Sequence, residues 1–376
     1  MKRRLYIPIL IAIASLFLSC EDTVTNTNWG DWEIFRGYMQ FSTEVSSRAH
    51  LVENMRGKNF GVIGFKYSET SNWGAAKAIT APGDWFYNKE VSCASDDGIC
   101  SYDPLTPWED NNYSFFAYHP YNGAGIELSK QGDVNTPTLT YTYGWLREIG
   151  NISTYDSNSS VYDLMTAEAI DVNGNGSGTV DLNFKHRLFA FEILANNYNE
   201  NSEGTTDARQ EITGLTLTLE GLTNTSMTIP LSMLNDEENQ KIVYESGDVG
   251  TRTFKISDDK LIIPAFNETI ERTFNGETEI CGAGVATSIS KYGSTNGGYV
   301  FLIPQEGTSG GVTGTLEWTE LQYFNGDVTT TFNSTITFMP GVLYQVHINF
   351  VGSGITIALI EAGTWEAGPD VTHTFE

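Results

Sequence analysis

A serine flanked by glycines is the first pattern in this chain that could carry chemistry. Gly307, Ser309 and Gly311 have the spacing of the Gly-x-Ser-x-Gly turn that presents a nucleophilic serine in hydrolases. That turn needs a helix after it, whereas residues 314–318 continue as a predicted strand. We therefore interpret residues 307–311 as a flexible turn.

An oxygen-rich loop beginning at Asp171 could hold calcium. Asp171, Asn173 and Asn175 fill the first, third and fifth places of a calcium loop, and Gly176 the sixth. The twelfth place holds Leu182 instead of the bidentate carboxylate that such loops use. We interpret this segment as a hairpin loop, and we expect no metal and no cofactor.

The histidines and carboxylates do not form an obvious catalytic set. The chain has five histidines, at positions 50, 119, 186, 347 and 373, and none belongs to a His-Glu-x-x-His pattern. His186 and His347 lie within predicted strands, which favours structural roles over acid–base work. The carboxylates are dispersed, and no glycosidase pair stands out. The sequence predicts that the protein is not an enzyme.

The elements that position these residues are strands. The 376 residues include 37 Gly, 20 Phe and 18 Tyr, and hydrophobic residues make up 40%, which suits sheets and turns better than helices or disorder. Period-2 alternation recurs along the chain, as in residues 39–45, 180–184, 215–219 and 344–350. We predict an all-β fold of antiparallel β-sandwiches. The formal charge of −26 makes nucleic acid a poor partner.

The N-terminus predicts export and lipid attachment. Lys2, Arg3 and Arg4 precede an apolar run, residues 5–18, that is too short to span a bilayer. The run ends in Ser19-Cys20, which resembles a bacterial lipobox whose cysteine is lipidated. Residues 1–19 would then be a lipoprotein signal peptide and 20–28 a lipidated tether. The alternative is an ordinary cleaved signal with an incidental cysteine.

Two further cysteines flank a turn signal. Cys93 and Cys100 enclose an Asp-Gly pair, so their Cβ atoms could face each other across a hairpin. A disulfide is plausible there in an oxidising envelope, and two free thiols are the alternative.

A polar stretch over residues 196–207 predicts a domain boundary. It would separate an N-terminal β-sandwich, residues 29–195, from a C-terminal one, residues 208–376.

Several short motifs, taken in order, resemble the Bacteroidales fimbrillin (Mfa-like) family of lipoprotein pilins. They are Phe60-Gly61-Val62-Ile63-Gly64-Phe65, residues 113–121 (YSFFAYHPY), Asp163-Leu164-Met165 with Val180, Phe184 and His186, residues 302–305 (LIPQ), and residues 339–344 (MPGVLY). The segment from Cys93 to Cys100 departs from the family pattern.

This resemblance implies two transthyretin-like sandwiches in tandem and a surface fimbrial subunit anchored in the outer membrane through its lipid. Its partners would be other fimbrial subunits, in a homo- or heteropolymer that supports adhesion to a host or bacterial surface. Assembly would proceed by donor-strand exchange after an Arg-directed protease cuts at Arg48, with Arg36 and Arg56 as alternatives.

The residues themselves are compatible with strand exchange. Residues 39–45 alternate as a strand would, and removal of a strand leaves backbone groups that invite a replacement. The apolar C-terminal segment with Ile355, Ile357 and Leu359 could be the donor strand. In each case the alternative is an ordinary permanent strand.

A glycan-binding surface lipoprotein that does not polymerise is the alternative function. Its binding platform would use some of Trp29, Trp32, Trp73, Trp108 and Trp145, whereas tryptophans in a sandwich more often fill the core.

Overall fold

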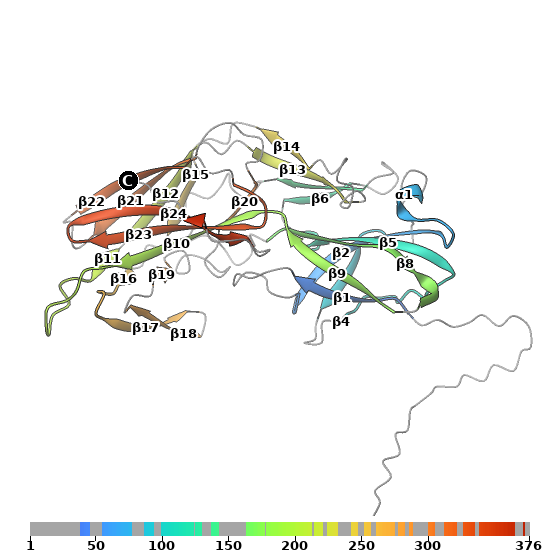
Figure 1. Cartoon of the computed structure of the whole chain (residues 1–376), viewed down its shortest axis with the longest axis horizontal. Helices are drawn as coiled ribbons and strands as arrows, with labels where there is room; N and C mark the ends of the chain where they lie inside the picture. The colour runs from blue at the N-terminus through green and yellow to red at the C-terminus, as the bar shows by residue number, and fades with distance from the viewer. Residues whose placement is uncertain are drawn as a thin grey trace, which may run out of the picture. The chain divides into compact units, whose positions relative to one another are not determined.

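Almost every described element of the chain is a strand (Figure 1). The computed structural model describes residues 38–45, 55–76, 86–93, 99–123, 125–129, 137–142, 163–176, 178–212, 214–220, 224–231, 242–246, 252–256, 261–274, 277–282, 286–288, 300–304, 312–321, 326–334, 338–364 and 371–372. The elements of these residues that are not strands are a short α-helix, α1 (Trp73–Ala76), and a 3-10 helix, η4 (Gly174–Gly176). The predicted all-β class is confirmed.

The first ten strands precede residue 198. They are β1 (Gln40–Val45), β2 (Lys58–Ser68), β3 (Lys89–Cys93), β4 (Ile99–Cys100), β5 (Asn111–His119), β6 (Ile126–Leu128), β7 (Thr138–Thr142), β8 (Met165–Asn173), β9 (Thr179–His186) and β10 (Phe189–Asn197).

Fifteen further strands follow. They are β11 (Gln210–Ile212), β12 (Gly214–Glu220), β13 (Asn224–Pro230), β14 (Val243–Ser246), β15 (Arg252–Ile256), β16 (Leu261–Ile263), β17 (Thr269–Phe274), β18 (Glu277–Gly282), β19 (Thr287–Ser288), β20 (Val300–Leu302), β21 (Val312–Leu321), β22 (Gly326–Ser334), β23 (Val342–Val351), β24 (Gly354–Thr364) and β25 (Val371–Thr372).

A seven-stranded sheet in the order β3-β2-β5-β8-β9-β1-β4 contains the first strand of the chain. In β9 the alternation is complete: Val180, Leu182 and Phe184 are buried, while the residues between them are exposed. Because successive side chains of a strand point to opposite faces, this pattern places one face of β9 against a core and the other in solvent.

Strands β2 and β5 are buried on both faces, which explains their nearly continuous apolar runs. Phe60 and Phe115 belong to the hydrophobic core that also contains Phe41 of β1. Phe65 and Phe116 belong to a second core, on the opposite face of the same strands. Two cores therefore share these central strands.

The remaining strands form other sheets. Strand β10 pairs in parallel with β23, which forms a hairpin with β24, in a six-stranded sheet ordered β19-β10-β23-β24-β25. The sixth strand, β20, also pairs with β10. The other sheets are β14-β13-β7-β6, β15-β12-β21-β22, β11-β16 and β17-β18.

Strands β7 and β10, which begin before the predicted domain boundary, both pair with strands that follow it. Strand β10 pairs with β19, β20 and β23. Strand β7 pairs antiparallel with β13, with Leu139 opposite Ile229. The described residues all belong to one compact unit, Arg36–Glu376. The division into residues 29–195 and 208–376, each a transthyretin-like sandwich, stays a prediction.

Candidate functional site: the first strand and its slot

Strand β1 lies between β9 and β4 (Figure 1). It runs parallel to β9 over six residue pairs, from Gln40 opposite Thr179 to Val45 opposite Phe184. It runs antiparallel to β4, with Phe41 opposite Cys100. The strand predicted from the alternation over residues 39–45 is confirmed. The space that β1 occupies between these two neighbours is called the β1 slot below.

The side chains of β1 face inward at alternate positions. Met39 and Phe41 are 1% and 0% exposed, whereas Gln40 and Glu44 are exposed. The Ser42 hydroxyl donates a hydrogen bond to the carboxylate of Asp181 on β9. The strand therefore combines an apolar inner face with a polar outer face, as a half-buried strand does.

The Phe41 ring lies among four other aromatic rings, which we call the aromatic socket. Its ring centroid lies 6.5 Å from Phe60, 5.8 Å from Phe86, 5.7 Å from Tyr102 and 5.4 Å from Phe115. Edge-to-face arrangements predominate, which is favourable for aromatic quadrupoles. The socket residues come from β2, β5 and the segments beside β3 and β4, so segments well separated in the chain meet around one ring.

Hydrogen bonds fix the region before β1 to the segment after β4. The Met39 amide donates to the Thr106 carbonyl at 2.9 Å, and Tyr38 forms an isolated bridge with Pro107. The Thr106 amide donates to the Tyr102 hydroxyl oxygen at 3.2 Å. Burial raises the pKa of Tyr102, so this ring stays neutral in its socket.

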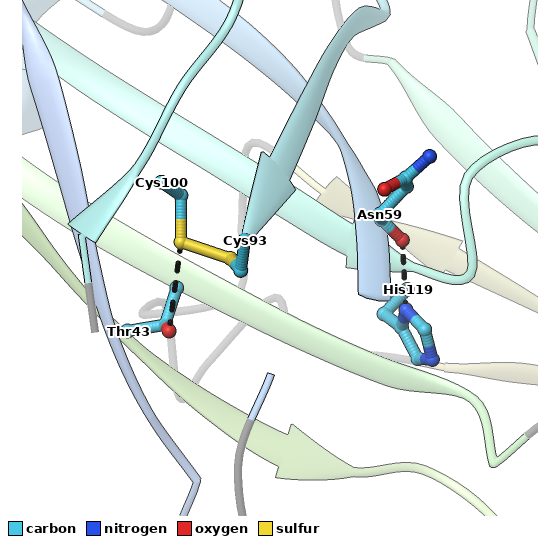
Figure 2. The surroundings of a disulfide bond; sticks show 5 residues. All are labelled: Thr43, Asn59, Cys93, Cys100 and His119. Atoms are coloured by element: carbon cyan, nitrogen blue, oxygen red, sulfur yellow. Dashed lines mark hydrogen bonds between the residues drawn. A yellow bond between two sulfur atoms is a disulfide. The ribbon is translucent and has the colours of Figure 1, made fainter. Parts of the chain in front are cut away.

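A disulfide joins Cys93 at the end of β3 to Cys100 in β4 (Figure 2). Next to it, Ser92 and Ser101 exchange two backbone hydrogen bonds of 2.8 Å. The Thr43 hydroxyl of β1 donates to Cys100 Sγ at 3.8 Å, because a disulfide sulfur has no proton to give (Figure 2). The wall of the slot formed by β4 is thus tied to β3.

Gly61, in the glycine-flanked strand of the sequence motif, allows a close approach of Tyr118. A Cβ atom at Gly61 would lie 2.4 Å from Tyr118 Cε1 and 2.8 Å from Asn88 Oδ1. The Tyr118 hydroxyl donates to Asn88 Oδ1 at 2.6 Å. Because no side chain fits between these groups, the motif requires glycine here for packing.

Asp163 and His186 explain the spaced Asp-Leu-Met and Phe-x-His motif. His186 Nδ1 lies 2.5 Å from Asp163 Oδ2, and both side chains are buried. The paired carboxylate supports the structural role predicted for His186.

His119 is a second buried histidine near this pair. Its Nδ1 donates to the Asn59 carbonyl at 2.8 Å, since a carbonyl oxygen can only accept (Figure 2). Burial lowers the pKa of His119 to about 4, which keeps the ring neutral.

The loop that resembles a calcium site is a hairpin connection whose first carboxylate is hydrogen-bonded to groups of the protein. Asp171, at φ 55°, accepts hydrogen bonds from the Tyr67 hydroxyl and from the Trp73 amide, at 2.5 and 2.7 Å. Asn173 Oδ1 accepts from the Asn175 amide at 2.7 Å, which closes a local turn. Across the described residues, no group of three His, Cys, Asp or Glu side chains could hold a metal ion.

The predicted donor residues lie in β24. Ile355, Ile357 and Leu359 stand opposite Phe350, Ile348 and Val346 of β23. Ile355 is half-buried and Ile357 is 6% exposed. On the other side, β25 pairs with β24 at Ile360 and Glu361.

Several predicted residues lie outside the described part of the chain, namely Cys20, Arg36, Arg48, residues 307–311 and Trp29, Trp32 and Trp145. Arg56 is described, in an exposed turn before β2. Trp73 and Trp108 are buried at 6% and 5% exposure, so neither presents a surface platform. No helix in the described ranges has the length and apolar character needed to cross a membrane.

Two contributors to the site carry no recognisable signal in the sequence. Phe86 and Tyr102 lie outside regular strand patterns, and nothing in their neighbourhood indicates that they meet Phe41. Asp163 and His186 belong to one sequence motif, and the pairing of Met165 with His186 across β8 and β9 brings them together.

One solved structure supports the fold. A candidate cell adhesion protein from Bacteroides ovatus superposes with a TM-score of 0.50 at 12% identity, covering 90% of this chain and 99% of that one. A fimbrial protein from Bacteroides vulgatus gives a TM-score of 0.47 at 17% identity, with the same two coverages.

Sequence comparison identifies the family. A curated relative, the fimbrium subunit Fim1C of Phocaeicola vulgatus, is 28% identical over 137 residues, and the match spans about a third of each protein, 34% of both. The family described as fimbrillin-like matches residues 47–365, well over half of the chain. The strand-rich fold and this long match lead to one conclusion: the chain belongs to the fimbrillin-like family of fimbrial proteins.

Proposed function

We propose that this protein is a surface fimbrial subunit that polymerises with other fimbrial subunits by donor-strand exchange and supports cell adhesion. The observation that carries the proposal is the position of β1: the first described strand of the chain is inserted between β9 and β4 and supplies a ring to the core. The lipid on Cys20 would tether the subunit to the outer membrane before processing.

Loss of β1 would create an acceptor site for another strand. The backbone groups of β9 and β4 that now pair with β1 would lose their partners, and the aromatic socket would be open. Unpaired strand edges beside an apolar furrow are the feature that extended segments of other proteins recognise by adding a strand.

The bounds of β1 discriminate among the three candidate cleavage sites. Arg36 precedes β1, so a cut there leaves β1 covalently joined to the rest of the sandwich. Arg48 follows the end of β1 at Val45, and Arg56 precedes β2. A cut at Arg48 or Arg56 therefore leaves β1 held by non-covalent contacts alone, and we favour Arg48.

The donor would be the C-terminal segment with Ile355, Ile357 and Leu359. In the single subunit this segment is paired with β23, so it must separate from β23 before it can fill a neighbour's slot. This segment belongs to β24, the last long strand described. Its departure would therefore not interrupt the connections between the strands that precede it in the chain.

Replacement of single arginines by lysine tests this function, because lysine keeps the charge but resists an arginine-specific protease. The mature chain, treated with such a protease, should form ladders that survive mild denaturant on a gel. Arg48→Lys should abolish the ladders, whereas the matched control Arg36→Lys should leave them unchanged. Ladders that persist in an Arg48→Lys/Arg56→Lys variant, or no ladders from the unaltered protein, would contradict the proposal.

A further inference from the structure

We propose that the β1 slot selects a strand that carries an aromatic residue at the position of Phe41, and that this strand comes from a different fimbrial subunit. This inference rests on the proposed function, and it adds what the incoming strand must look like. It follows from the construction of the aromatic socket, from the disulfide behind it and from the side chains that the chain's own β24 could offer.

The walls of the aromatic socket contact one another as well as Phe41. Phe86 lies 5.1 Å from Tyr102 at an interplanar angle of 78°, and 5.9 Å from Phe115. Phe60 lies 5.2 Å from Phe184 of β9. Because these contacts do not involve β1, the walls keep partners when Phe41 leaves.

The disulfide holds the two walls that come from loop segments. Phe86 lies three residues before β3, and Tyr102 lies two residues after the end of β4. The Cys93–Cys100 bond and the paired backbones of Ser92 and Ser101 join those two strands. Departure of β1 therefore breaks neither the covalent link of β4 to β3 nor the contact between Phe86 and Tyr102.

The neighbours of β1 also set the direction and register of a replacement. The incoming strand must run parallel to β9 and antiparallel to β4, with its ring opposite Val180 and Cys100. The position two residues earlier is buried, as Met39 is now. The next position faces Asp181, where Ser42 now donates a hydrogen bond. The preferred strand thus has an apolar residue at the Met39 position, any residue next, an aromatic residue at the Phe41 position and a small polar residue at the Ser42 position.

A second copy of this chain offers a poor match through β24. Its alternating residues Ile355, Ile357 and Leu359 are aliphatic and leave part of a socket built for a ring unfilled. An unfilled volume in a core reduces the stability of the packing around it. A subunit with a ring in its donor strand would bind better, so the polymer that these contacts favour is a heteropolymer.

Peptide binding to the processed protein tests the inference. The full mature chain, cut by an arginine-specific protease, is titrated with fluorescent peptides of residues 38–45 and 354–361, and with the first peptide carrying Phe41→Ala or Glu44→Ala. We expect the Phe41→Ala peptide to bind about 100-fold more weakly than the unaltered one, and the 354–361 peptide at least about 10-fold more weakly. The Glu44→Ala peptide is the matched control and should bind equally well, because Glu44 is exposed.

The outcomes separate the inference from the proposed function. Equal binding of the unaltered and Phe41→Ala peptides would overturn the inference and leave strand exchange standing. Failure of every peptide to bind would overturn both.

A second measurement needs neither cleavage nor polymerisation. In the intact chain, Phe41→Ala should empty the aromatic socket, and toluene should then raise the melting temperature of the variant but not of the unaltered protein. Addition of Cys93→Ser and Cys100→Ser should remove this effect, because the walls are no longer tied. If Phe41→Ala does not fold, Phe41→Val replaces it. A folded variant indifferent to toluene would overturn the inference.

Discussion

Asp163 Oδ2 lies 2.5 Å from His186 Nδ1, with side-chain exposures of only 2% and 1%. The pair joins Asp163 to His186, which is the last residue of β9, and β9 also pairs with β1. A buried ionisable pair of this kind is costly to break, because the remaining partner is left in the core without its counterpart.

Asp163→Ala should lower the free energy of unfolding by about 3 kcal/mol, because it removes one member of a buried pair. Urea unfolding followed by tryptophan fluorescence measures the change. Glu109→Ala is a suitable control, since it removes an exposed ion pair with Lys66, 3.0 Å long with exposures of 36% and 55%, and should cost less than about 1 kcal/mol. Equal losses in the two variants would contradict the importance assigned to the buried pair.

Acid should destabilise the protein through His119. Its pKa is lowered from 6.5 to about 4 in the folded chain, so below pH 6.5 the unfolded state takes up a proton that the folded state refuses. The contribution of neutral His119 to the free energy of unfolding is fully present above pH 6.5 and is lost as the pH falls toward 4.

Between pH 7 and pH 4.5 this loss should amount to about 2 kcal/mol. Urea midpoints measured at both values, for the unaltered protein and for His119→Asn, give the test. The variant should show a smaller pH dependence; the same dependence in both proteins would rule His119 out as its source.

Phe41→Ala should cost about 3–5 kcal/mol of stability, because it empties a site enclosed by four aromatic rings. Glu44→Ala on the same strand changes an exposed side chain and should stay within about 0.5 kcal/mol of the unaltered protein. Thermal or urea unfolding of both variants checks the difference. If Phe41→Ala lowered the free energy of unfolding no more than Glu44→Ala does, Phe41 would not be contributing to the hydrophobic core.

Gly61→Ala should lower the free energy of unfolding by about 2 kcal/mol, because the added methyl group overlaps the Tyr118 ring. Gly178→Ala adds the same group where nothing lies within 4 Å, and its φ is not in the left-handed region. The comparison therefore separates crowding from the loss of glycine flexibility. Matching stabilities of the two variants would show that Tyr118 can move aside.

Local patterns in the sequence were enough to predict strands but not their partners. Alternation in β9 and β1 indicated which residues face inward, because a half-buried strand must alternate. The parallel pairing of β1 with β9 brings together distant segments, and nothing within either segment specifies it. The same holds for β13, which pairs with β7 from the other side of the predicted boundary.

The site was partly predictable for the same reason. The Asp-Gly turn signal placed Cys93 and Cys100 near each other, since a hairpin is a local structure. Phe86 and Tyr102 lie outside periodic segments, so their meeting around Phe41 depends on tertiary packing alone. Within the motifs that carry the family resemblance, Gly61 is required by the close approach of Tyr118 and Asp163 by its pairing with His186.

The bond between β3 and β4 has a consequence for solubility. These two strands stand at the opposite ends of the seven-stranded order, and Ser92 pairs with Ser101 to bring those ends together. Edge strands joined in this way expose fewer unpaired backbone groups, so they are poor templates for aggregation. We therefore expect the folded protein to remain dispersed while β1 is in place. Under the proposed strand exchange, the segment that would leave for assembly would thus protect the protein beforehand.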